Sequence, residues 1–163
     1  HVLEQGSLDN CVAFLKANPS PNSGNMLIAS AEGKALDVEC SPGGMRVLRP
    51  QEGVLVHSNH FQELNKDDTD IGSLLLPDTF GRTARLYAHF HDAAGHAGEE
   101  KIEEGLRDHT GLPNSVCRHE DGNKPPAERW QTLVSFYANL NTRTIRYTGG
   151  PPCQSEYYRK QLV

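Results

Sequence analysis

The spacing of apolar residues along the chain changes from helical to alternating near residue 24. Residues 7–17 have the spacing of one helix face, whose apolar members are Leu8, Cys11, Val12 and Leu15. Ser7 can accept a hydrogen bond from the first free backbone amides of such a helix. Pro19 and Pro21 follow and prevent the helix from continuing. We therefore predict a short amphipathic helix and then an extended crossing.

Short apolar runs separated by turn residues come next, which is the pattern of an antiparallel meander. The expected strands cover residues 26–29, 36–40, 45–49 and 54–56. In the second strand the apolar residues alternate with Asp37 and Glu39, so one side should face the core and the other should face solvent or a second layer. The fourth strand leads directly into a polar motif, His57-Ser58-Asn59-His60.

The second half of the chain combines helical and alternating patterns, which indicates an α+β fold class. Asp78 can begin a helix that runs to about residue 94, and a second helix is expected over about residues 98–109, with its glutamates in solvent. Further strands are expected at residues 115–119, 133–138 and 144–147, and from residue 156 onward. The polar stretches 62–78 and 120–129 are predicted surface insertions, and the first should wall a cleft beside Asn59.

Length and composition indicate one domain, or the C-terminal part of one, over residues 1–163. A chain of 163 residues is too short for two domains of ordinary size. Its apolar content of 36% and mean hydropathy of -0.59 are low for a self-sufficient core, although the periodic segments exclude disorder. The net charge of -5 without a basic block excludes nucleic acid as a partner. A membrane span is also excluded, because no apolar run reaches roughly 18 residues.

The cysteines and histidines give no recognisable metal-binding spacing. Four cysteines lie far apart without a Cys-x-x-Cys pair, namely Cys11, Cys40, Cys117 and Cys153. Reduced and mostly buried thiols are the favoured interpretation, and we expect an intracellular protein. His89, His91 and His96 are close in sequence, but a helix would point the first two apart and no cysteine or carboxylate completes the set. We therefore expect no metal site and no cofactor.

The motif at residues 57–60 is the first candidate for chemistry. His57, Asn59 and His60 could supply a general base and a donor to a developing oxyanion, because an asparagine amide held at a strand end can point at a tetrahedral intermediate. The alternative is that all three side chains cap unpaired backbone groups of the strand. The residues themselves leave both interpretations open.

Residues 115–119, Ser-Val-Cys-Arg-His, are the second candidate. Cys117 stands beside Arg118, whose guanidinium could lower the pKa of the thiol and create a nucleophile. Against this, Cys117 follows a turn into an expected strand, where it would be a core thiol, and Arg118 would bind a carboxylate. An autonomous thiol enzyme that uses Cys117 is therefore a minor alternative.

Three segments together resemble one family in their order and approximate spacing. They are residues 23–39, the His-Ser-Asn-His-Phe motif at 57–61, and Asp-His-Thr-Gly-Leu-Pro-Asn-Ser-Val-Cys-Arg-His at 108–119, with Gly-Pro-Pro-Cys following at 150–153. This combination resembles the acyl-CoA:isopenicillin N acyltransferase-like family of self-processing amidohydrolases and acyltransferases. The resemblance covers most of the chain.

The resemblance implies both a fold and a reaction. Members of this family are N-terminal nucleophile hydrolases, in which two antiparallel sheets stack between helical layers in an αββα sandwich. They cut themselves before a cysteine, whose thiol then attacks an amide or thioester and forms an acyl-cysteine. The matching motifs imply that Asn59 is an oxyanion donor and that Arg118, with Ser115 beside it, belongs to the active site. His57 and His60 would support Asn59.

The chain departs from the family pattern at the nucleophile. The family's cysteine precedes the first matched segment, whereas Cys11 lies on the apolar face of the expected helix and is no substitute. We therefore expect the C-terminal part of such a protein, inactive alone, whose partner is a missing N-terminal segment or subunit that carries the nucleophile. The expected substrate is a small amide or an acyl thioester such as an acyl-CoA. The alternative function is a non-catalytic binding module with the same sandwich.

Overall fold

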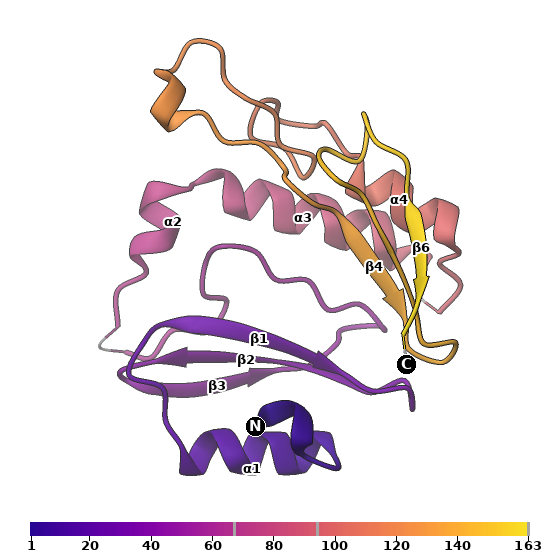
Figure 1. Ribbon diagram of the computed structural model, residues 1–163. Coiled ribbons are helices and arrows are strands. Elements are labelled where there is room, and N and C mark those ends of the chain that lie inside the picture. The colour runs from indigo at the N-terminus through magenta and orange to yellow at the C-terminus, as the bar shows by residue number, and fades with distance from the viewer. Residues whose placement is uncertain (67, 94, 163) are drawn as a thin grey trace. The chain divides into compact units, whose positions relative to one another are not determined.

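The computed structural model describes residues 1–66, 68–93 and 95–162 and divides the chain into two compact units (Figure 1). The first unit is His1–Thr79 and the second is Phe80–Val163. Each contains one three-stranded antiparallel sheet together with helices. The fold class is therefore α+β, as predicted, and it is consistent with the N-terminal nucleophile hydrolase type. The stacking of the two sheets into a sandwich stays a prediction.

The first unit begins with the predicted amphipathic helix. A 3-10 turn, η1 (Val2–Glu4), precedes α1 (Leu8–Ala17). The Oγ atom of Ser7 accepts a hydrogen bond from the backbone amide of Asn10 at 3.2 Å, so the predicted helix cap is confirmed. This bond satisfies one of the amides that have no partner inside the helix.

The predicted meander forms the sheet of the first unit. Its strands are β1 (Gly24–Ala29), β2 (Ala35–Ser41) and β3 (Gly44–Leu48), with β2 in the middle. Both pairs are antiparallel and joined by short turns. The first turn contains Gly33 at φ 77°, a conformation that glycine adopts without steric cost.

The two faces of β2 are buried for different reasons. One face packs against α1, which runs along the sheet in Figure 1, and the core cluster there consists of Leu15, Leu36, Val38 and Cys40. The other face carries Asp37 and Glu39, which are 0% and 1% exposed. Side chains and backbone from residues 57–63 cover these carboxylates. A second layer therefore lies over the polar face, and solvent does not.

The predicted fourth strand at residues 54–56 is wrong. Gln51 and Val54 form only an isolated bridge, with reciprocal backbone hydrogen bonds of 2.9 Å, and the chain then continues without regular structure. The tight turn between them places Glu52 at φ 50° and Gly53 at φ 83°. The chain leaves this turn across the face of the sheet, where His57 reaches β2, and does not pair with an edge strand. Apolar burial without strand pairing explains why the hydrophobic run misled the prediction.

The stretch 62–78 contains a short helix, α2 (Ile71–Leu75), and leads into α3 (Asp78–His91). Asp70 caps α2, because its Oδ1 atom accepts a hydrogen bond from the Ser73 amide at 3.1 Å. The helix predicted to end near residue 94 ends at His91, and Ala94 itself lies outside the described residues.

The second unit combines α4 (Glu99–Leu106) and the 3-10 turn η2 (Pro126–Glu128) with a sheet. The strands are β4 (Phe136–Asn139), β5 (Thr144–Tyr147) and β6 (Tyr158–Gln161), arranged in that order. The glutamates of α4 were expected in solvent, and Glu99, Glu100 and Glu104 are exposed, whereas Glu103 is partly buried against the sheet. Glu103 accepts a hydrogen bond from the Tyr137 hydroxyl at 2.8 Å, and Glu99 pairs with Arg146.

The predicted strand at residues 115–119 is also wrong. Two of its backbone bonds go to its own loop, since the Cys117 amide donates to the Asp108 carbonyl and the His119 amide donates to the Pro113 carbonyl, both at 3.0 Å, and the Arg118 backbone bonds to Thr132. These bonds fold residues 108–119 into a compact loop, so no strand partner is needed.

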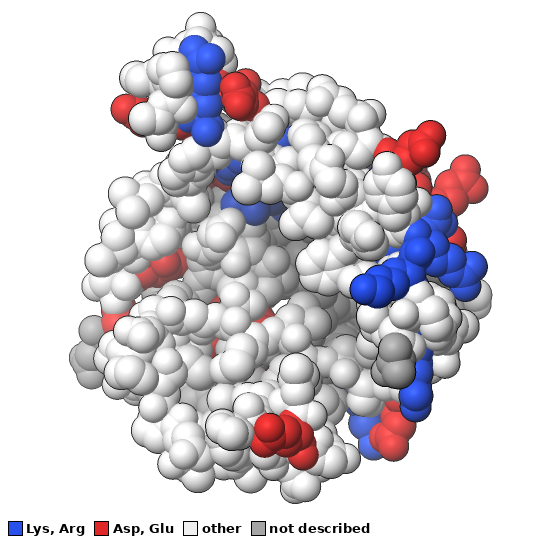
Figure 2. Space-filling model, viewed as in Figure 1, with Lys and Arg blue, Asp and Glu red and all other residues white. Residues whose placement is uncertain are grey.

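Two surface properties bear on possible partners. No helix in the described part of the chain has the length and apolar character needed to cross a membrane. On the face drawn in Figure 2, acidic and basic residues are interspersed and uncharged residues dominate. That face differs from the continuous basic surfaces that bind nucleic acids.

Candidate active site

A pocket of about 400 Å³ lies in the first unit, beside the His57–His60 motif. This volume is within the range of about 300–1,000 Å³ that is typical of small-molecule sites. One wall consists of residues 57–61, another comes from the start of β1, and a third is formed by residues 69–72. The prediction that the polar stretch after residue 62 walls a cleft beside Asn59 is thus confirmed.

His57 is oriented by hydrogen bonds on both ring nitrogens. Its Nε2 atom lies 2.8 Å from Glu39 Oε1, and its Nδ1 atom lies 2.7 Å from the Ser58 carbonyl oxygen. Both neighbours are acceptors, so the contacts are fully satisfied when the ring carries both protons. Asp37 Oδ2 lies 3.6 Å from the same Nε2 atom. His57 therefore sits in a buried acidic environment that holds the ring in one orientation.

Asp37 is the second carboxylate of this buried group. Burial raises the pKa of Asp37, although a hydrogen bond from the Asn25 side chain at 3.1 Å and the proximity of His57 act in the opposite direction. The cause is the loss of hydration, which disfavours the charged form. Asp37 can therefore hold a proton more readily than an exposed aspartate.

Glu39 fixes the backbone of the motif. Its Oε1 atom accepts a hydrogen bond from the Gln62 amide at 2.6 Å, and its Oε2 atom accepts one from the Glu63 amide at 2.9 Å. Together with the contact to His57, these bonds engage both carboxylate oxygens. Sequence reasoning did not assign Glu39 a role. The available signal was a carboxylate in a strand whose other face is core, which requires partners if it is covered.

Thr79 holds the middle of the motif from another direction. Its fully buried Oγ1 atom accepts a hydrogen bond from the Asn59 amide at 2.7 Å and lies 2.8 Å from His60 Nδ1. The Asn59 side chain is exposed and lines the pocket, whereas His60 is buried. The backbone around Asn59 is thus anchored, and the residue is exposed at the pocket wall.

The opposite wall is tied to the motif through Asp70 and Gly72. Asp70 Oδ2 accepts a hydrogen bond from the Phe61 amide at 3.0 Å. A Cβ atom added at Gly72 would lie 2.7 Å from the Asn59 carbonyl oxygen, so the backbones approach too closely for a side chain. This packing sets the width of the pocket beside Asn59.

Ser115 and Arg118 lie together in the second unit. Ser115 is fully buried, and its Oγ atom donates a hydrogen bond to the Cys117 carbonyl at 2.6 Å. The Arg118 backbone pairs with Thr132 through two 3.0 Å hydrogen bonds, and its Nη1 atom donates to Asn114 Oδ1 at 2.9 Å. The predicted site residues therefore form two groups, one in each unit.

Cys117 has the properties of a protonated thiol. Its side chain is fully buried, and this burial raises the pKa of Cys117 to about 11. A thiol with such a pKa is almost entirely uncharged at neutral pH and is a poor nucleophile. The environment of Cys117 therefore disfavours the alternative of an autonomous enzyme that uses this residue.

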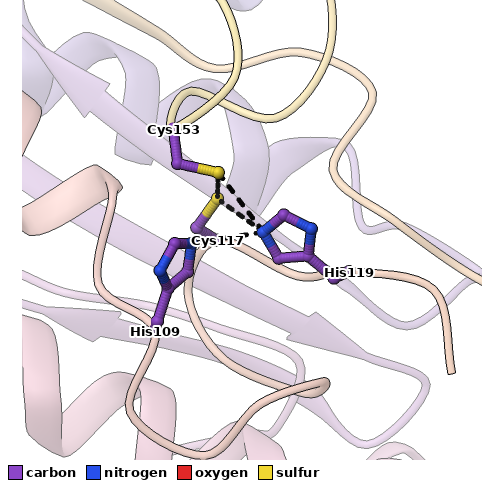
Figure 3. A group of neighbouring side chains, drawn as sticks. All are labelled: His109, Cys117, His119 and Cys153. Atoms are coloured by element: carbon purple, nitrogen blue, oxygen red, sulfur yellow. Dashed lines mark hydrogen bonds between the residues drawn. The ribbon is translucent and has the colours of Figure 1, made fainter.

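Sequence reasoning missed a cluster of sulfur and nitrogen ligands around Cys117. One possible ligand atom from each member lies within 4.8 Å of all the others, and the members are His109, Cys117, His119 and Cys153 (Figure 3). The short spacings in the sequence pointed to His89, His91 and His96 instead. Only the folding of the 108–119 loop against the turn at 149–153 brings the four residues together.

Comparison with known proteins identifies the family. The family model described as acyl-coenzyme A:6-aminopenicillanic acid acyl-transferase matches residues 1–154, which is most of the chain. The chain therefore belongs to this acyltransferase family, and the resemblance drawn from the three sequence segments is confirmed. A search of curated proteins gave no match.

Proposed function

We propose that the chain supplies the oxyanion-binding part of a cysteine amidohydrolase or acyltransferase. The observation that carries this proposal is the pocket beside Asn59, in a chain whose family is one of acyltransferases. Asn59 is the member of the motif whose amide side chain is exposed at the pocket wall, and its backbone is anchored by Thr79. A rigid amide donor can stabilise the negative oxygen of a tetrahedral intermediate.

In this proposal the nucleophile comes from another segment of the complete protein. Cys11 and Cys40 are buried in the first unit, and Cys117 is a buried thiol whose pKa is raised by burial. No cysteine lines the described pocket. The thiolate of the other segment would attack the carbonyl carbon of an amide or thioester, and the carbonyl oxygen would take the electron pair. Collapse of this intermediate expels the amine or thiol and leaves an acyl-cysteine, which water or an amine then attacks.

The remaining predicted residues have supporting roles in this proposal. Glu39 holds His57, and Thr79 holds His60 and the Asn59 amide, so these groups position the donor. Arg118 would bind a negatively charged part of the substrate, because its guanidinium presents several donors. The Ser115 hydroxyl would stabilise the loop that carries Arg118 through its bond to the Cys117 carbonyl.

The test uses the complete, self-processed protein and follows hydrolysis of an acyl-CoA and of a small amide. Asn59→Ala should lower kcat by roughly 100- to 1,000-fold, because the oxyanion loses one donor, while KM changes little. The matched control is Asn10→Ala on the exposed side of α1, which should leave both constants unchanged. Equal kinetics for Asn59→Ala and the control would refute the role of Asn59.

A non-catalytic binding module is the second candidate, and the absence of a cysteine among the residues lining the described pocket favours it. Such a module would bind an acyl amide or acyl-CoA in the pocket without turnover. Calorimetric titration of the complete protein, combined with product analysis, separates the two functions. Binding that Asn59→Ala weakens, without any product, would favour the module over the enzyme.

A further inference from the structure

The cluster around Cys117 has the dimensions of a metal site. The two sulfur atoms of Cys117 and Cys153 are 3.6 Å apart, and His119 Nε2 lies 3.6 Å from the first and 3.3 Å from the second. His109 Nε2 lies 3.2 Å from His119 Nε2 (Figure 3). All four atoms lie within 4.8 Å of one another. Four good metal ligands therefore surround one small volume.

These distances match the edges of a tetrahedron around zinc. Zn–S bonds of about 2.3 Å and Zn–N bonds of about 2.0–2.1 Å place ligand atoms about 3.8 Å apart for two sulfurs, about 3.6 Å for sulfur and nitrogen, and about 3.4 Å for two nitrogens. The observed values are 3.6 Å between the sulfurs, 3.6 and 3.3 Å between sulfur and nitrogen, and 3.2 Å between the nitrogens. Small side-chain movements would complete the geometry.

Hydrogen bonding alone accounts poorly for this arrangement. His119 Nε2 is approached by two thiols and by His109 Nε2, as the dashed lines in Figure 3 show. A neutral imidazole nitrogen either accepts at one lone pair or donates one proton. It cannot make good hydrogen bonds to three groups at once. A cation at the centre would satisfy all four ligand atoms.

The backbone holds the ligands in place independently of any metal. Two backbone hydrogen bonds of 3.0 Å anchor Cys117 to the Asp108 carbonyl and His119 to the Pro113 carbonyl. Arg107 Nε donates to the Pro152 carbonyl at 2.9 Å, which brings the residue before Cys153 to the same place. A site that is preorganised in this way loses little conformational entropy when it binds an ion.

We propose that His109, Cys117, His119 and Cys153 bind one Zn²⁺ ion with tetrahedral geometry. Two cysteines and two histidines form a ligand set that is typical of zinc, and they leave no open coordination position, which indicates a structural site. On binding, the two thiols release their protons to solvent, two Zn–S and two Zn–N bonds form, and the hydrated ion loses its water. No group is oxidised or reduced. The two thiolates neutralise the charge of the ion.

The zinc site would stabilise the loop that carries Arg118. Three ligands come from residues 109–119 and the fourth from the turn at 149–153, so the ion joins segments that are distant in sequence. Ser115 and Arg118 lie between the ligands along the chain, and their backbone would be fixed by the metal. This inference does not depend on the acyltransferase proposal, because metal binding is measured without any substrate.

The experiment measures metal bound to the protein after purification with a reductant and without chelator. We expect about one zinc ion per chain by elemental analysis and by native mass spectrometry. Replacement by Co²⁺ should give the visible absorption of tetrahedral cobalt together with a thiolate-to-cobalt charge-transfer band. A band of that kind identifies cysteine sulfur as a ligand, which adventitious surface binding does not produce.

Two ligand variants and two controls locate the site. Cys153→Ser and His109→Asn change exposed residues, so both proteins should fold, as circular dichroism would verify. Each should lower zinc affinity by roughly 100-fold or more, since changes in outer-shell partners alone cost about 10- to 100-fold. Cys11→Ser and His91→Asn change the same residue types elsewhere and should retain the wild-type affinity.

Three results would overturn the proposal. The first is a reduced, folded protein that binds no zinc and gives no thiolate-to-cobalt band. The second is a disulfide between Cys117 and Cys153 that persists in reductant at the level of the glutathione pool, detected by peptide mass mapping. The third is unchanged zinc affinity in both ligand variants. If Cys153→Ser failed to fold, the comparison between His109→Asn and His91→Asn would still decide.

Discussion

Replacement of Glu39 should release the loop that forms the pocket wall. The carboxylate accepts hydrogen bonds from the Gln62 and Glu63 amides and pairs with His57, and its side chain is 1% exposed. Glu39→Ala leaves two backbone donors and a histidine without their acceptor in a buried place. Removing one partner of a buried pair costs roughly 3–5 kcal/mol, so we expect a loss of about 4 kcal/mol in the free energy of unfolding.

Glu39→Gln should lower the free energy of unfolding by less than Glu39→Ala does. It should remove the hydrogen bond of one of the two backbone amides and keep that of the other. The glutamine oxygen can replace only one carboxylate oxygen, and its NH2 group would then face a second donor, either Gln62 or Glu63. One unsatisfied buried donor costs roughly 1–3 kcal/mol, so the loss should be about half that of Glu39→Ala. Comparing the losses in free energy of the two variants therefore tests the geometry of the hydrogen bonds to Glu39 as well as the burial of its side chain.

Urea unfolding followed by circular dichroism measures the loss in the free energy of unfolding of the whole protein. Hydrogen exchange of the Gln62 and Glu63 amides measures the loss of local stability in the loop. The control is Glu32→Ala, because Glu32 is an exposed partner of Lys34 and should contribute less than about 1 kcal/mol. The reasoning is refuted if Glu39→Ala costs no more than Glu32→Ala. It is equally refuted if the two amides exchange at the wild-type rate in a folded Glu39→Ala protein.

Two further predictions concern the same unit. Because burial raises the pKa of Asp37, the contribution of this residue to the free energy of unfolding is complete below its ordinary pKa of 3.8. That contribution is lost as the pH rises through the higher pKa of Asp37 in the folded protein. The Tm of Asp37→Asn relative to wild type should therefore increase with pH over that window, and a difference in Tm that stays constant with pH would contradict it. Gly72→Ala should lower the Tm, because its Cβ would meet the Asn59 carbonyl at 2.7 Å, whereas Gly81→Ala in α3 meets no atom within 4 Å and should be neutral or stabilising by up to about 1 kcal/mol. Equal Tm values for these two variants would contradict this prediction, because they would mean that the pocket wall moves to accommodate the added Cβ atom.

The resemblance to the family determined which residues were expected in the site, and the structure changes the role expected for several of these residues. Asn59 keeps its place at a pocket, whereas His57 and His60 are each engaged by a buried partner. Glu39 and Thr79 enter as positioning residues that no motif indicated. The roles of Asn59, Ser115 and Arg118 in catalysis stay predictions, which the kinetic comparison of Asn59→Ala with its control addresses.

The sequence by itself predicted the elements whose signals are local. Ser7 and the apolar spacing after it predict α1, and alternating residues between turns predict β1 to β3, because helix caps and strand periodicity depend on neighbouring residues. The ordered motifs also predicted the family. The short runs at 54–56 and 115–119 failed, because an apolar run of that length shows burial without showing whether a partner strand is present.

Only the tertiary structure decided which distant residues meet. Glu39 reaches Gln62 and Glu63 because residues 57–63 cross the polar face of β2, and no local pattern encodes that crossing. The zinc-ligand cluster likewise depends on a long-range contact. His109, Cys117 and His119 lie in one loop, and Cys153 lies in a turn that is 30 residues or more further along the chain. Such contacts follow from the packing of the whole unit, because a buried carboxylate or thiol requires partners and these partners can come from any part of the chain.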